Sequence, residues 1–82
     1  MWNNYSVKFR IIEFGDMGFD VKTVQRLLHA TGIHDDNTHK RCHVTGILDN
    51  QTVRILKKFQ KRAGITVQSK VDADTFNALM RW

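Results

Sequence analysis

All four histidines and the single cysteine of this 82-residue chain fall in one short stretch, at His29, His34, His39, Cys42 and His43. Imidazole and thiolate are the ligands that zinc prefers, and several of these side chains would converge if the stretch folded back. Their spacing matches no zinc-finger or H-E-x-x-H pattern. We therefore favour a solvated polar loop with a half-buried cysteine, and keep a metal site built from His34, His39, Cys42 and His43 as the alternative. No cofactor is predicted.

The reactive side chains of the sequence also give little support for covalent or acid–base catalysis. Cys42 and His43 are neighbours, and in an extended segment adjacent side chains point to opposite faces. Glu13 is the only glutamate, so a carboxylate pair would need aspartates, and Asp49 and Asp72 stand where helix N-caps are expected. We predict no catalytic residue and a domain that is not an enzyme.

Composition indicates one small globular domain with an excess of positive charge. Hydrophobic residues make up 41% and charged residues 26%, and the net charge of +5 favours an anionic partner such as nucleic acid, a membrane surface or a wall polymer. No apolar run approaches the roughly 20 residues that span a bilayer. The first residues lack the features of a signal peptide, so we expect a piece of a longer protein or another export route.

The positions of these side chains depend on three segments with helical periodicity, separated by glycines in a chain without proline. They predict helices over about 20–31, 50–63 and 73–81, with Asp16 or Asp20 as the acid at the first entry. The fold class is therefore all-α, a compact three-helix bundle. Residues 1–14 alternate apolar side chains as a strand does, but no partner strand is predicted. We expect a lead-in over 1–11 and a domain over 12–82.

Two helix entries repeat the same pattern. Residues 46–56 align with 69–79, and each copy has an aliphatic residue, an Asp and then a Thr three positions later. In both we expect the Asp to cap the helix and the Thr to face back toward it. Gln25 and Gln60 flank core positions, and we expect their amides to hydrogen-bond backbone at the connectors. The stretch 34–43 has few large apolar residues and is expected to be an exposed loop.

The second helix also carries a basic face without an acid: Arg54, Lys57, Lys58, Lys61 and Arg62. Such a face could neutralise phosphates, which makes a small nucleic-acid-binding domain the alternative function. A solvated helix face is the commoner outcome, and Phe59 is expected to face the core rather than stack on bases.

Three fragments in order resemble the peptidoglycan-binding domain family of three-helix modules. They are Gly15–Val21 with Val24–Leu28 and Gly32, then Gly46–Asp49 with Thr52, Phe59–Gln60 and Gly64–Ile65, and finally Asp72 with Thr75–Leu79. The likeness covers about residues 12–80. Ala73 and Phe76 depart from the family, which commonly has Pro and Trp there.

The resemblance implies a non-catalytic domain with a shallow groove for glycan or stem peptide. It further implies a monomer that tethers a covalently linked cell-wall hydrolase or transpeptidase, such as an endolysin or amidase, to its substrate. The location would be the bacterial cell envelope or outside the cell, or the wall reached by a phage lysin. From expected exposure near the two repeated helix entries, we predict ligand contacts at Asp49, Gln51, Arg54, Asp74 and Asn77.

Overall fold

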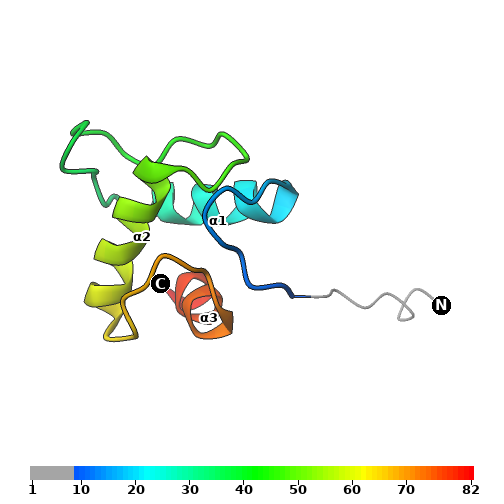
Figure 1. Cartoon of the computed structure of the whole chain (residues 1–82). Coiled ribbons are helices and arrows are strands. Elements are labelled where there is room, and N and C mark those ends of the chain that lie inside the picture. The colour runs from blue at the N-terminus through cyan, green and yellow to red at the C-terminus, as the bar shows by residue number, and fades with distance from the viewer. Residues whose placement is uncertain (1–8) are drawn as a thin grey trace.

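The computed structural model describes residues 9–82, which form three helices: α1 (Phe19–Ala30), α2 (Asn50–Ala63) and α3 (Ala73–Arg81). Figure 1 shows α1 and α2 crossing at a steep angle, with α3 in the angle between them. Helix α1 packs against both other helices. The predicted all-α class and three-helix architecture are confirmed, and each predicted helix boundary lies within one residue of the observed one.

The two repeated helix entries have the same geometry, as the repeat predicts. Asp49 precedes α2 and accepts from the Thr52 amide at 3.0 Å and from the Thr52 hydroxyl at 2.6 Å. Asp72 precedes α3 and accepts from the Thr75 amide at 2.9 Å. Each carboxylate thus satisfies a first-turn N–H that has no partner within its helix.

Each capped Thr is also bonded by a buried glutamine from the preceding helix. Gln25 of α1 donates to the Thr52 hydroxyl at 3.0 Å and to the Ile47 carbonyl at 2.9 Å, and its amide oxygen accepts from the Gly46 N–H at 2.8 Å. The glutamine therefore joins α1 to the connector and to the entry of α2 in one network. This confirms the role expected for it.

Gln60 of α2 repeats this arrangement one helix later. It donates to the Thr75 hydroxyl at 3.2 Å and the Lys70 carbonyl at 3.0 Å, and accepts from the Gln68 N–H at 2.8 Å. Both glutamines are fully buried. A buried amide is costly unless it is bonded, and within residues 9–82 every buried side-chain nitrogen and oxygen has a hydrogen-bond partner.

The entry of α1 is built differently. Gly18 precedes the helix with φ of 147°, and no side chain caps it. Asp20 supplies the first-turn acid and accepts from the Val21 amide at 2.9 Å. Asp16 instead accepts from the Glu13 amide at 2.8 Å and so closes a turn ahead of the helix.

The segment that precedes α1, residues 9–18, does have partners, contrary to the expectation from sequence for residues 1–14. This segment, which joins residues 9–11 of the predicted lead-in to the start of the predicted domain, is called the lead-in below. Ile12 pairs with Val71 through two backbone hydrogen bonds of 3.1 and 2.9 Å, and Leu48 donates to the Asp16 carbonyl at 2.9 Å. These are isolated bridges to the two connectors rather than a sheet. Phe9 and Arg10 also contact the helices, so the packed part of the chain extends at least to Phe9; the rest of the predicted lead-in, residues 1–8, lies outside the described residues.

The core lies where the three helices meet the connectors. Its buried apolar side chains come from every segment, and the members without measurable exposure are Val21, Val24, Leu28, Leu48, Ile55, Leu56, Phe59 and Val71. Phe59 faces this core as predicted, and Trp82 covers it edge-on with ring centroids 5.1 Å apart. None of the helices in residues 9–82 is long and apolar enough to cross a membrane.

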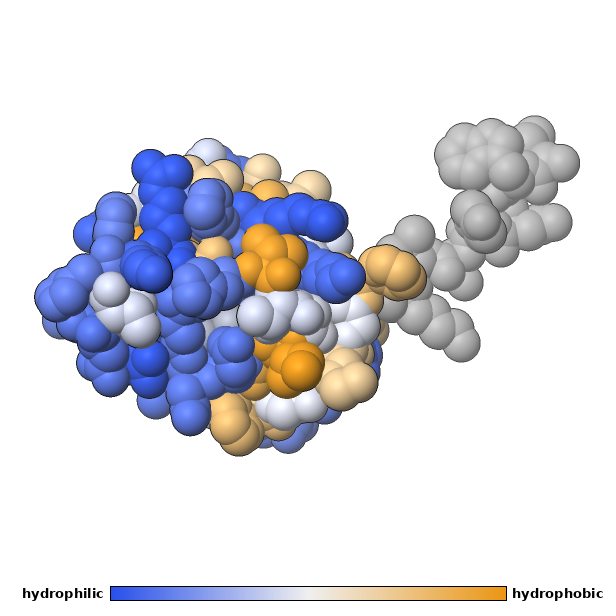
Figure 2. All heavy atoms as spheres, turned by 90° about the horizontal axis from the view of Figure 1, so that it is seen from above, coloured by the Kyte–Doolittle hydropathy of each residue, from blue (hydrophilic) through white to orange (hydrophobic). Residues whose placement is uncertain are grey.

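The loop expected to be exposed over 34–43 is exposed only in part. Asp35 and Cys42 are buried, because Asp35 turns in toward α2 and the Cys42 thiol lies 3.8 Å from the Thr52 hydroxyl. Figure 2 shows hydrophilic residues gathered on the side of this loop and α2, and apolar residues toward the side where the lead-in enters.

Replacing Gln25 tests the importance of the buried network. In Gln25→Met, the buried Gly46 N–H and the Thr52 hydroxyl each lose a partner, and we expect the free energy of unfolding to fall by about 3 kcal/mol. In Gln68→Met, a half-buried amide loses one hydrogen bond to Asp72, and the expected loss is below about 1 kcal/mol. Urea denaturation of both variants measures the difference, and equal losses would contradict the account.

Candidate functional site

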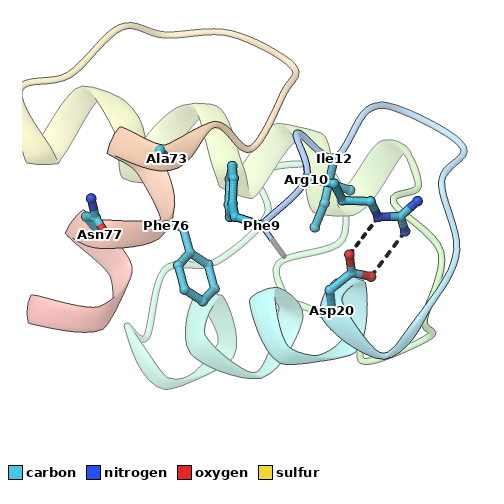
Figure 3. A pocket seen from close by; sticks show the side chains of 7 residues that line it. All are labelled: Phe9, Arg10, Ile12, Asp20, Ala73, Phe76 and Asn77. Atoms are coloured by element: carbon cyan, nitrogen blue, oxygen red, sulfur yellow. Dashed lines mark hydrogen bonds and ion pairs between the residues drawn. The ribbon is translucent and has the colours of Figure 1, made fainter. Parts of the chain in front are cut away.

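The clearest concavity of the described chain lies between the lead-in, the start of α1 and the start of α3. It has a volume of about 380 Å³ and its lining is mostly apolar. Figure 3 shows the side chains that line it: Phe9, Arg10, Ile12, Asp20, Ala73, Phe76 and Asn77. A small apolar hollow with a few polar groups at its edge is the usual form of a ligand site.

Two aromatic rings from distant parts of the chain meet in this pocket. Phe9 of the lead-in and Phe76 of α3 have ring centroids 5.9 Å apart at an interplanar angle of 52°. Phe76 is half-buried against the core, while Phe9 remains 45% exposed. Ile12 is buried, and its pairing with Val71 fixes the lead-in at this place. The pocket therefore presents an apolar surface on which the Phe9 ring is exposed to solvent.

An ion pair forms one end of the pocket. The Arg10 guanidinium donates to both carboxylate oxygens of Asp20, at 2.6 and 3.1 Å, and to the Met17 carbonyl at 2.7 Å. The guanidinium lowers the pKa of the Asp20 carboxyl. Gly18 leaves room for this pair, since a Cβ there would lie 2.7 Å from Asp20 Oδ1 and 3.3 Å from Arg10 Nη2.

Asn77 lies at the other end. It is exposed on α3, and in Figure 3 the two rings stand between it and the Arg10–Asp20 pair. Its amide offers two N–H donors and one carbonyl acceptor. The pocket thus combines an apolar middle, a neutral amide and a mutually neutralised charge pair.

A second, more open hollow of about 330 Å³ lies on the other side of the α1 entry. It is lined by Met17, Gly18, Phe19, Lys22, Thr45, Gly46 and Ile47. The Lys22 ammonium stands 5.6 Å from the centroid of the Phe19 ring, and Phe19 is 84% exposed. An aromatic ring so open to water has no role in the core.

Of the five ligand contacts predicted from sequence, Asn77 alone lines the first pocket. Asp74 is exposed in the first turn of α3 but is not part of the lining. Asp49, Gln51 and Arg54 belong to the entry of α2, where the structure gives each of them bonds within the chain. The structure therefore does not bring the five together.

The expected exposure of Gln51 is wrong. Only 8% of this residue is exposed, because the 34–43 loop folds over the start of α2. Its amide oxygen accepts from the His43 N–H at 2.9 Å, and its nitrogen donates to the Arg41 carbonyl at 3.3 Å. Gln51 therefore fixes the loop to α2.

Arg54 serves the same loop. Its guanidinium makes two bonds to the buried Asp35 carboxylate, at 2.7 and 3.0 Å, and Thr38 adds a hydroxyl donor at 2.9 Å. The guanidinium first, and Thr38 after it, hold the pKa of Asp35 well below its ordinary value of 3.8, against the opposing effect of burial. Neither residue of this pair lines either hollow.

The histidine and cysteine stretch does not form the alternative metal site. Within residues 9–82, no three His, Cys, Asp or Glu side chains lie close enough together to hold an ion. His34 bonds the Gly32 carbonyl at 2.8 Å, while Cys42 is buried beside Thr52. Burial raises the pKa of the Cys42 thiol to about 11, so it stays protonated at neutral pH, unlike an activated nucleophile.

Most residues of the pocket were not predicted from the sequence. Phe9 and Arg10 lie in a segment expected to be a lead-in, and Asp20 was expected only as a first-turn acid. The available signal was the pair of glycines at 15 and 18, whose positive φ values turn the chain back toward α1. That turn brings residues ten positions apart into an ion pair.

Comparison with known families bears directly on this fold. A family model described as "Putative peptidoglycan binding domain" matches residues 18–79, which is most of the chain and includes all of α1 and α2 and all of α3 except its last two residues. The chain belongs to this family. The resemblance of its three fragments is thereby confirmed. No curated protein and no solved structure matches the chain.

The ion pair between Arg54 and the buried Asp35 carboxylate is open to a direct test. Asp35→Asn removes the carboxylate, and we expect the free energy of unfolding at pH 7 to fall by about 2–3 kcal/mol, less than for a fully buried pair because Arg54 is partly exposed. The neighbouring Asp36→Asn removes an exposed pair with Lys58 and should cost below about 1 kcal/mol.

The same variant predicts a pH dependence. Folding lowers the pKa of Asp35, so the unfolded chain takes up a proton at this carboxyl before the folded chain does as the pH falls. The contribution of the ionised carboxylate to the free energy of unfolding is therefore complete above a pH of about 5 and is lost as the pH falls through 4 and below. Asp35→Asn should therefore lose less stability than the native chain between pH 5 and 3. Urea denaturation at each pH measures this, and parallel curves would contradict the assignment.

Proposed function

We propose that this chain binds bacterial peptidoglycan through the pocket between the lead-in, α1 and α3. Membership of the family supports peptidoglycan as the ligand. The pocket supports the location, because it is a concave surface with an exposed aromatic ring, Phe9, at its centre. We place Asn77 in this site. Asp49, Gln51 and Arg54 are assigned to the structure of the α2 entry instead.

A site of this size supports tethering rather than tight capture. A hollow of about 380 Å³ buries little area, so each contact is expected to be weak to moderate. Linkage to a catalytic domain would still raise the local concentration of that domain at the wall. We therefore propose that the domain works as a non-catalytic monomer attached to a cell-wall hydrolase or transpeptidase, in the bacterial envelope or in a phage lysin acting on the wall.

The basic face of α2 supports the nucleic-acid alternative less well. Arg54 is paired with Asp35, and Lys58 donates to Asp36 at 2.8 Å and to the His34 carbonyl at 2.7 Å. Two of the five cations of this face thus serve the 34–43 loop. What remains resembles a solvated helix face that also favours approach to an anionic wall.

Co-sedimentation with purified sacculi tests the proposal. The full 82-residue chain should sediment with sacculi, and Phe9→Ala should weaken this binding by about five- to tenfold, since about 1 kcal/mol is typical for one aromatic contact. Phe14→Ala is the matched control, because Phe14 is 58% exposed but lies outside both hollows. Its binding should equal that of the native chain.

Two outcomes would contradict the proposal. One is a chain that stays in the supernatant at every salt concentration. The other is binding to a DNA duplex with a steep salt dependence, lost in Lys57→Glu and Lys61→Glu, together with no retention on sacculi.

A further inference from the structure

The pocket has little to offer a charged ligand. Among the described residues that line it, Arg10 is the only cation. The Nε and Nη2 donors of this guanidinium already bond the Asp20 carboxylate and the Met17 carbonyl. The carboxylate in turn is neutralised by that cation. A ligand carboxylate would enter beside Asp20 without a free counter-charge. The stem peptides of peptidoglycan carry such carboxylates, so the charge balance disfavours them.

The same lining suits an N-acetylated sugar. The apolar middle, formed by Phe9, Phe76 and Ala73, can take the acetamido methyl and the C–H face of a pyranose ring. At one end the Asn77 side chain can donate an N–H to the acetamido carbonyl and accept from the acetamido N–H. At the other end the fixed Arg10–Asp20 pair offers its remaining N–H groups and lone pairs to neutral hydroxyls.

The two hollows are lined by neighbouring residues at the entry of α1. Asp20 lines the first pocket and its neighbour Phe19 lines the second, while Arg10 bonds the Met17 carbonyl between them. Gly18 lies at this junction and places no side chain there. A chain polymer leaving the first pocket would therefore meet the exposed Phe19 ring next.

We propose that the site recognises the glycan strand of peptidoglycan, with one N-acetylhexosamine in the pocket at Phe9 and Asn77 and a later unit on Phe19. This assignment rests on the proposed function and narrows its ligand from peptidoglycan to the sugar backbone. Stem peptides remain outside the pocket. The affinity then depends on the length of the glycan.

Isothermal titration of the full chain with N-acetylglucosamine oligomers tests this, with a free stem peptide titrated in parallel and sacculi co-sedimentation as the reference. The affinity should rise by about five- to tenfold from the disaccharide to the hexasaccharide, because one added aromatic contact contributes about 1 kcal/mol. Phe19→Ala should abolish that rise and leave disaccharide binding unchanged. Asn77→Asp should weaken every oligomer, whereas Asn50→Asp, on an exposed residue of α2, should weaken none.

The outcomes separate the two levels of the proposal. The chain could be retained on sacculi and show a heat of binding with the stem peptide but none with the sugar oligomers. That result would overturn the glycan assignment and leave peptidoglycan binding intact. Affinity independent of oligomer length, or a Phe19→Ala variant with the native length dependence, would overturn the role of the second hollow. Failure to bind sacculi would overturn the proposed function itself. Thermal unfolding of each variant confirms that it is folded.

Discussion

The hydrogen bonds of two buried glutamines are the constraint on which the rest of this small fold depends. Gln25 and Gln60 each join one helix to the connector that follows and to the capped Thr of the next helix. A chain of 82 residues buries few apolar side chains, and each connector places one of them, Leu48 or Val71, in the core. The side-chain amides of the two glutamines add directed hydrogen bonds that fix the connectors. Because the arrangement is repeated, the starts of α2 and α3 are positioned in the same way.

The fixed connectors then determine where the lead-in lies, and the lead-in makes the site. Val71 offers its backbone to Ile12, and Leu48 offers its own to Gly15 and Asp16. Held at both places, the lead-in brings Phe9 against α3 and Arg10 against the start of α1. The pocket therefore depends on long-range pairing and lies apart from the repeated helix entries. The charged face of α2 has a different role, because two of its cations hold the 34–43 loop against the helix.

The parts of the fold that could be predicted from sequence are those specified locally. Helical periodicity, the Asp caps and the glutamines beside core positions all report on contacts close in the chain or repeated in it. The lead-in pairing could not be predicted, because an isolated bridge leaves no alternating pattern in its partner. Gln51 was expected to be exposed from its place on the helix. The loop that covers it is held by long-range contacts, among them Asp35 with Arg54 and Asp36 with Lys58. The same limit applies to Arg10 and Asp20, whose pairing depends on the turn between them.

The proposed site places the ligand between the lead-in, α1 and α3. The most direct measurement is a two-dimensional NMR titration of the isotope-labelled chain with soluble muropeptides released from sacculi. Binding in the pocket should shift the amide signals of Phe9, Arg10, Asp20 and Asn77 and of their neighbours. Shifts confined to the exposed face of α2, around Lys57 and Lys61, would contradict it, as would a spectrum that does not change.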